Sequence, residues 1–143
     1  MIVKSFPVGL LQCNCTVLGD PSTREAIVVD PGDDIARVLG ALREDGLTCR
    51  AILNTHTHLD HVGANQALKE ATGARLMLHE ADLPLYDNLD VQAAMLGLPL
   101  PPVADMEGSL VDATAIAFGT LELCVLHTPG HTPGSVTFTV AAN

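Results

Sequence analysis

Three histidines and an aspartate lie within six consecutive residues, and another histidine lies far downstream in a segment rich in proline and glycine. The first group is His56, His58, Asp60 and His61, in the pattern H-x-H-x-D-H, and the later residue is His131. Imidazole nitrogen and carboxylate oxygen are ligands that suit zinc, and they also bind iron and manganese. Zinc lowers the pKa of bound water to about 7, which supplies a hydroxide nucleophile at neutral pH. This pattern predicts a metal centre that performs hydrolysis.

The alternative explanation is a polar loop that contains histidines by chance. The chain has only six histidines, and three of them fall in this one segment. Such clustering favours a metal site over a coincidence.

A short apolar run, residues 51–53, precedes the first group and is typical of a buried strand. The polar residues after it should form the loop at the strand's carboxyl end, where open α/β sheets place their sites. Side chains two residues apart in an extended segment project to the same side, so His56 and His58 should face one point. We expect a helix to begin near Val62 or Gly63, directly after the candidate ligands.

Other elements follow from the pattern of apolar and turn-forming residues. Asp33 or Asp34 should cap a helix that ends at Gly46, and a second helix should cover about residues 64–71. We expect His79 to act as a capping or surface residue. Residues 80–102 contain short helical patterns and a proline-rich stretch, which we interpret as a connection in preference to a flap over the site. Strands are expected at residues 2–6, 15–18, 26–30, 51–53, 75–78, 115–118, 121–126 and 136–140.

The H-x-H-x-D-H motif resembles the signature of the metallo-β-lactamase superfamily, and its surroundings are most similar to the glyoxalase II (hydroxyacylglutathione hydrolase) branch. Three more segments carry the likeness: residues 7–15 (PVGLLQCNC), residues 26–32 (AIVVDPG) and residues 128–135 (TPGHTPGS). The resemblance implies an α+β fold of the αββα type. Residues 1–143 would form one domain, the N-terminal portion of a four-layer sandwich whose second layer is incomplete.

The resemblance also implies how the ligands are shared. His56, His58 and His131 would bind one metal, and Asp60 and His61 a second, with Asp60 also orienting the nucleophile as a catalytic residue. His127 has no role in that pattern. The complete family site holds two zinc ions, although iron or manganese is possible, and it uses a bridging aspartate and a final histidine that this sequence does not contain. Five of seven expected ligands are therefore present.

By resemblance, the expected activity is hydrolysis of a small-molecule thioester, such as a hydroxyacyl-glutathione, by metal-bound hydroxide. The first alternative is a persulfide dioxygenase of the same superfamily, with a single iron. The second is a metal-binding module without activity, which the missing bridging aspartate would explain. The sequence does not determine the oligomeric state.

Composition and charge narrow the expected partners. The chain of 143 residues is 48% hydrophobic with a mean hydropathy of +0.31. This high hydrophobic content suggests that additional sequence covers one face of the domain, so we expect the chain to be C-terminally incomplete.

A formal net charge of −10 without a cluster of lysines and arginines disfavours nucleic acid as a partner. No apolar run is long enough to span a bilayer, so we expect no membrane partner.

The amino terminus lacks the apolar core and cleavage site of a secretory signal, so we expect a cytoplasmic protein, which counts against an exported β-lactamase. The four cysteines show no C-x-x-C spacing, and we expect buried, reduced thiols.

Overall fold

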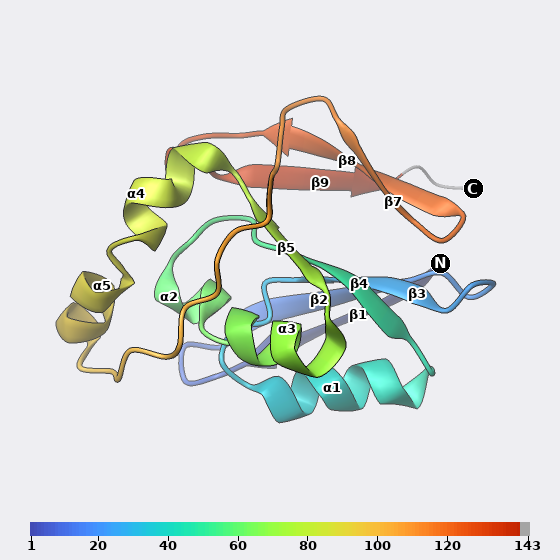
Figure 1. The fold of residues 1–143 in the computed structure, drawn as a ribbon, viewed down its shortest axis with the longest axis horizontal. Helices are drawn as coiled ribbons and strands as arrows, with labels where there is room; N and C mark the ends of the chain where they lie inside the picture. The colour runs from blue at the N-terminus through green and yellow to red at the C-terminus, as the bar shows by residue number, and fades with distance from the viewer. Residues whose placement is uncertain (141–143) are drawn as a thin grey trace.

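The computed structural model describes residues 1–140, which form two β-sheets with helices on the outer face and at one end of the larger sheet (Figure 1). The larger sheet contains β1 (Ile2–Val8), β2 (Cys13–Gly19), β3 (Glu25–Val29), β4 (Thr48–Leu53), β5 (Arg75–Leu78) and β6 (Gly108–Ser109), in that order. The smaller sheet contains β7 (Ala115–Phe118), β8 (Leu121–His127) and β9 (Val136–Val140). All the expected strands are present within a few residues of their predicted bounds.

The direction of the strands determines where the site lies. β1, β2 and β3 pair antiparallel, whereas β3, β4, β5 and β6 pair parallel. The carboxyl ends of β3, β4 and β5 therefore meet at one edge of the larger sheet. Asp30, Asn54 and His79 directly follow these three strands, so polar side chains gather at that edge, as expected from the sequence.

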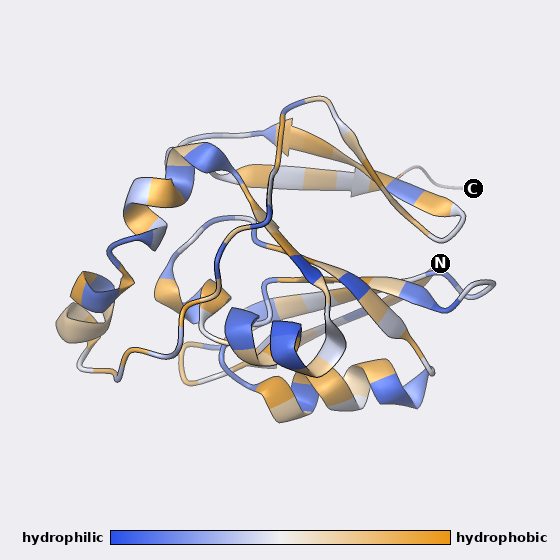
Figure 2. Ribbon diagram, viewed as in Figure 1, coloured by the Kyte–Doolittle hydropathy of each residue, from blue (hydrophilic) through white to orange (hydrophobic). Residues whose placement is uncertain are grey.

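Two helices cover the outer face of the larger sheet (Figure 1). α1 (Ile35–Glu44) begins after Asp34, whose side chain accepts a hydrogen bond from the Arg37 amide, and this confirms the predicted cap. α3 (Asn65–Thr72) ends at Gly73, which adopts the left-handed conformation with φ of 71°. Figure 2 shows hydrophilic residues on the exposed sides of these helices and hydrophobic residues through the central strands.

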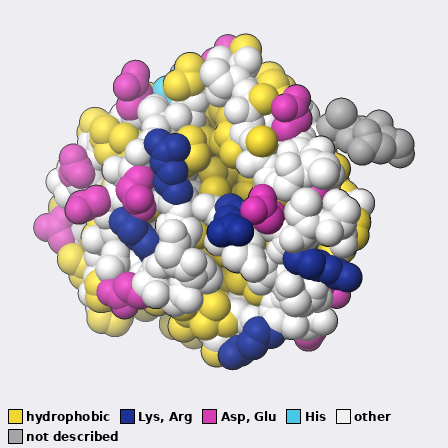
Figure 3. Space-filling view, turned by 45° about the vertical axis from the view of Figure 1, so that its right-hand side comes forward, with side chains coloured by type: hydrophobic (Ala, Val, Ile, Leu, Met, Phe, Trp, Pro, Cys, Tyr) yellow, Lys and Arg dark blue, Asp and Glu magenta, His cyan; other side chains and the backbone are white. Residues whose placement is uncertain are grey.

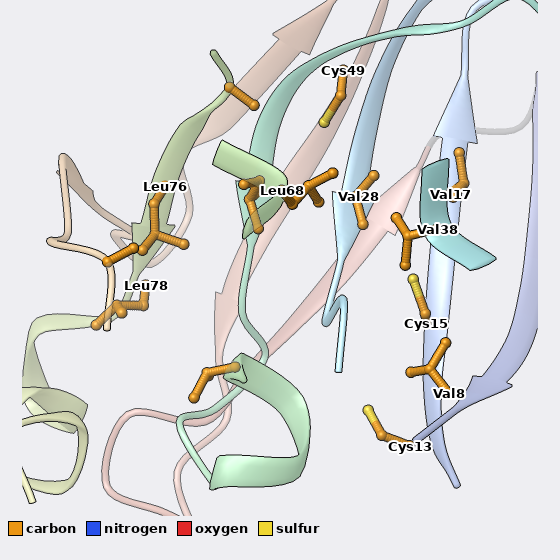
Figure 4. Close-up of a cluster of buried hydrophobic side chains, with 14 of the residues drawn as sticks. Val8, Cys13, Cys15, Val17, Val28, Val38, Cys49, Leu68, Leu76 and Leu78 are labelled. Carbon is orange, nitrogen blue, oxygen red and sulfur yellow. The ribbon is translucent and has the colours of Figure 1, made fainter. Parts of the chain in front are cut away.

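Two apolar cores lie on the two faces of the larger sheet. The first lies between this sheet and α1 and α3, and Figure 4 shows Val28, Val38, Leu68 and Leu76 pointing into it. The second lies between the two sheets and contains Phe118 among its fully buried side chains. Helix, large sheet and small sheet thus form three successive layers, the N-terminal portion of the expected αββα sandwich.

No helix covers the outer face of the smaller sheet among residues 1–140 (Figure 1). In the same part of the chain, no helix is long and apolar enough to cross a membrane.

Figure 3 shows a face on which lysine and arginine side chains lie apart from one another, among acidic and apolar residues.

Two local expectations need correction. The helix predicted to begin near Val62 is α2 (Leu59–Val62), so Asp60 and His61 lie inside a helical turn and not before it. Strand β6 was not expected, because Gly108 and Ser109 carry no strand pattern and form one only by pairing with β5. The short helical patterns predicted in residues 80–102 are confirmed: this segment contains the 3-10 helix η1 (Glu80–Asp82), then α4 (Leu83–Tyr86) and α5 (Leu89–Leu96), before the irregular proline-rich stretch.

Candidate metal centre

The tertiary structure brings together His56, His58 and His131 from two loops far apart in the sequence. The first two follow β4 in the larger sheet, and His131 lies between β8 and β9 of the smaller sheet. One nitrogen from each ring lies within 4.8 Å of the others, close enough for small side-chain rotations to bring all three onto one ion. The ring centroids are 4.7 to 4.9 Å apart.

His56 shows the clearest fit to a metal. Its Nε2 atom is buried and has no hydrogen-bond partner among the described residues. Its Nδ1 atom lies 3.0 Å from Thr55 Oγ1, which in turn lies 2.6 Å from a carboxylate oxygen of Asp30. Since the Thr55 hydroxyl donates to this carboxylate, it accepts from His56 Nδ1, and the lone pair of a neutral ring is then on Nε2. A buried, unpaired acceptor of this kind is what a metal ion requires.

Burial supports the same protonation state. Burial, followed by the nearby His61 ring, lowers the pKa of His56 to about 4. Burial, with the ring of His131, also lowers the pKa of His58. Both rings are therefore neutral at neutral pH, which is the form that binds metal.

Asp60 and His61 lie beside the three-histidine cluster. Asp60 Oδ2 is 3.4 Å from His61 Nε2, and the ring of His61 is 4.0 Å from that of His56. The structure therefore brings all five predicted ligands into one region. Burial lowers the pKa of His61, but the hydrogen bond to Asp30 together with the negative charges of Asp30 and Asp60 outweighs it and leaves this pKa raised.

Asp30 organises this region, a role that the sequence reasoning missed. Its buried carboxylate accepts from the Thr55 amide at 2.8 Å and from the Thr55 hydroxyl, and it lies 3.0 Å from His61 Nδ1. The sequence predicts a strand at residues 26–30, and residues 26–32 carry part of the family resemblance, but neither assigns Asp30 a role at the site. The position of Asp30 could have indicated its role. It is an acidic residue at the carboxyl end of β3, and β3 pairs parallel with β4, the strand that precedes His56 and His58.

A second buried carboxylate, that of Asp82, joins the two ligand loops. It accepts hydrogen bonds from the Thr57 amide at 3.0 Å, from the Thr132 hydroxyl at 2.9 Å and from the Gly134 amide at 2.6 Å. Sequence reasoning did not identify this residue either, because nothing in the short helical pattern around it indicates burial.

An apolar pocket of about 270 Å³ lies next to Asp60. The turn after β1 forms one wall with Leu10 and Leu11, and the proline-rich residues 98–101 form another. Asp60 itself lines the pocket, which connects it to the candidate centre. Residues 98–101 connect α5 to β6, as expected, and they also line this pocket.

The remaining two histidines lie outside the cluster. His79 accepts a hydrogen bond from the Ala81 amide at 3.0 Å, which confirms its predicted capping role. Its ring stacks on that of His127, with centroids 4.0 Å apart.

Known proteins share both the sequence and this architecture. The family model described as the metallo-beta-lactamase superfamily matches residues 8–143. An uncharacterized protein of Mycobacterium leprae is 38% identical over the whole chain and 69% of its own length. Hydroxyacylglutathione hydrolase GloC of Haemophilus influenzae is 34% identical, covering 96% of the chain and 66% of the relative.

Two solved structures superpose on the same elements. BLEG-1, a B3 metallo-beta-lactamase, has a TM-score of 0.86 and 32% identity, covering 97% of this chain and 67% of its own. A protein crystallised in a di-iron-bound form has a TM-score of 0.81 and 38% identity, and the match covers 96% of this chain and 66% of that protein. The chain thus spans about two thirds of the length of these proteins. Since the family model extends over nearly all of it and includes both histidine loops, the chain belongs to the metallo-β-lactamase superfamily of metallo-hydrolases.

Proposed function

We propose that the protein is a thioester hydrolase of the glyoxalase II type, with metal held by His56, His58 and His131 and a second metal by Asp60 and His61. The observation that carries the proposal is the convergence of three histidines from two loops, one with a buried and unpaired Nε2 atom. When bound, zinc would lower the pKa of its coordinated water to about 7 and polarise a carbonyl oxygen.

The protein's own residues prepare this chemistry. Burial keeps His56 neutral, and the Asp30–Thr55 chain fixes its tautomer. Asp30 also holds Nδ1 of His61, which leaves Nε2 of that ring directed to the side of Asp60. The Asp60 carboxylate borders the pocket, where it can orient an attacking water toward a substrate carbonyl.

The pocket and one relative suggest the class of substrate. The residues that line the pocket beside Asp60 are mostly leucine, proline and glycine, with no lysine or arginine among those described. Such a pocket suits an apolar group next to the scissile bond. The relative named hydroxyacylglutathione hydrolase supports a thioester as that bond.

Zinc is the proposed metal, because imidazole and carboxylate ligands suit it. Iron is the alternative to test, because one similar structure is described as di-iron-bound. Elemental mass spectrometry of purified protein, with the intact mass checked, gives the metal and its stoichiometry directly.

Activity is tested with a hydroxyacyl-glutathione, with and without oxygen, and with a chromogenic β-lactam for comparison. We expect release of free thiol that is independent of oxygen and abolished by a chelator. Turnover that requires oxygen would favour the dioxygenase, and preferential β-lactam cleavage would favour the activity named for the B3 enzyme. Bound metal without any turnover would support the inert module.

A further inference from the structure

Asp82 lies in η1, outside both ligand loops, yet its side chain contacts both. The residue is 0% exposed. Its Oδ2 atom accepts from the Thr57 amide and from the Thr132 hydroxyl, and its Oδ1 atom accepts from the Gly134 amide. Thr57 lies between the two histidines of the first loop, and Thr132 directly follows the histidine of the second.

We propose that Asp82 is a positioning residue for the metal: its carboxylate sets the distance between the His56/His58 loop and the His131 loop. This inference rests on the proposed metal-dependent function. Asp82 would not contact the metal or the substrate, and it would act only through the backbone that carries the ligands.

The need for such a residue follows from the fold. The two loops belong to different sheets, which pack through an apolar core that has no directional preference. One backbone hydrogen bond, from the Val136 amide to the Thr55 carbonyl at 2.8 Å, already joins the loops. Asp82 adds hydrogen bonds to Thr57, which follows His56, and to Thr132, which follows His131. These bonds act on the backbone directly beside the ligands, so they set the distance between His56 and His131.

A carboxylate is required at this position, and an amide of the same shape would not replace it. The two oxygens accept from backbone amides of opposite loops, at 3.0 Å for Thr57 and 2.6 Å for Gly134. In Asp82→Asn, one of these amides would face the NH₂ group, whichever way the side chain turned. The loop that lost its acceptor would then move away.

Gly134 provides an independent observation of the same contact. A Cβ atom built on Gly134 would lie 2.7 Å from the Asp82 nitrogen and 2.8 Å from its Cβ and Cγ. The loop thus approaches Asp82 more closely than any other residue type permits. Gly134→Ala should push the loops apart without changing the carboxylate.

Asp20 offers a matched control. It is 1% exposed, and each of its oxygens accepts from a backbone amide and a hydroxyl, those of Ser22 and of Thr120. It joins the turn after β2 to the β7–β8 hairpin, at the end of the sheets opposite the histidines. Asp20→Asn therefore disturbs an equivalent network that carries no ligand.

The experiment is a titration with Zn²⁺ alone against a chromophoric chelator. It compares the unaltered protein with Asp82→Asn, Gly134→Ala and Asp20→Asn, and it records the urea unfolding midpoint of each metal-free form. We expect zinc affinity to fall about 10- to 100-fold in the first two variants, the usual size for outer-shell partners. Asp20→Asn should have a lower unfolding midpoint and an unchanged zinc affinity.

Equal zinc affinity in the unaltered protein and Asp82→Asn would overturn the inference and leave the proposed function intact. An equal loss in Asp20→Asn would also overturn it, because the loss would then reflect general stability. Failure of the unaltered protein to bind zinc would overturn the inference and the zinc-dependent function together. If Asp82→Asn does not fold, Gly134→Ala and Thr132→Val, which removes one hydroxyl donor to Asp82, provide the test.

Discussion

At the scale of single residues, the surroundings of each histidine indicate whether that histidine suits a metal ion. His56 has its Nδ1 satisfied and its Nε2 buried without a partner. His127, by contrast, places its Nε2 2.9 Å from the Pro133 carbonyl and stacks its ring on His79. Hydrogen-bonding state, more than residue type, is therefore the reason for which we propose His56, and not His127, as a ligand.

His58→Ala and His127→Ala test this distinction. Removing His58 deletes one of three convergent nitrogens, so we expect zinc affinity to fall by more than the roughly 10- to 100-fold of an outer-shell partner. His127→Ala removes a histidine that lies outside the cluster and should leave zinc affinity unchanged. Chelator competition measures both, and retention of full affinity in His58→Ala would contradict the ligand assignment.

At the scale of elements, polar side chains at strand ends join segments that belong to different sheets. Asp82 does so at the carboxyl edge of the parallel strands, and Asp20 does so at the opposite end, whereas Asp30 joins loops that follow neighbouring strands of the larger sheet. Each accepts backbone amides that would otherwise be unsatisfied in a buried turn. These contacts decide the relative position of loops that apolar packing leaves free to shift.

Asp20 has a predicted effect on acid stability. The hydrogen bond from the Ser22 side chain, followed by that from the Thr120 amide, holds the pKa of Asp20 well below its usual range. A depressed carboxyl pKa stabilises the folded state at pH values above the unfolded pKa of about 4, and this contribution is lost as the pH falls below that value. In metal-free urea denaturation, Asp20→Asn should therefore be less stable than the unaltered protein at pH 7, and the difference should narrow below about pH 4. A difference that stays constant from pH 7 to pH 3 would contradict this.

The cysteines provide a test of the strand faces. Cys13, Cys15 and Cys49 are buried, and burial raises the pKa of all three thiols, to about 12 for the last two. Cys124 is only partly buried, on the outward face of β8. Because alkylation requires the thiolate and access, iodoacetamide at pH 8 should modify one thiol per chain in native protein and four in denaturant. Mass mapping that finds Cys15 modified first would contradict the orientation of β2.

At the scale of the whole molecule, the candidate metal centre lies where the two sheets meet. Its histidines come from a loop of each sheet, so a bound ion would join the two layers in addition to the apolar core between them. Metal binding should therefore be coupled to the stability of the whole structure.

Metal removal tests this coupling. Zinc at 100 times its dissociation constant should stabilise the protein by about 2.7 kcal/mol, which raises Tm by roughly 5 to 15 °C. Thermal unfolding with and without a chelator measures the shift, with His58→Ala as the control that should show little of it. An equal shift in both proteins would show that zinc acts elsewhere on the chain.

The sequence by itself determined the elements and the chemistry of the first loop. Apolar runs between turn-forming residues predicted the strands, because strand burial depends on local patterning, and H-x-H-x-D-H placed four candidate ligands within one loop. The sequence also drew attention to His131, but only the family resemblance assigned it to the same metal as His56 and His58, since no local rule links residues so far apart.

Only the tertiary structure decided which polar side chains hold that chemistry in place. Asp30 and Asp82 are ordinary acidic residues in sequence, and they gain their roles because parallel pairing of β3, β4 and β5 puts their segments at one edge. The pocket beside Asp60 likewise combines a turn near residue 10 with a proline-rich stretch near residue 100. Such juxtapositions depend on long-range packing, which is a property of the folded chain and not of any local segment.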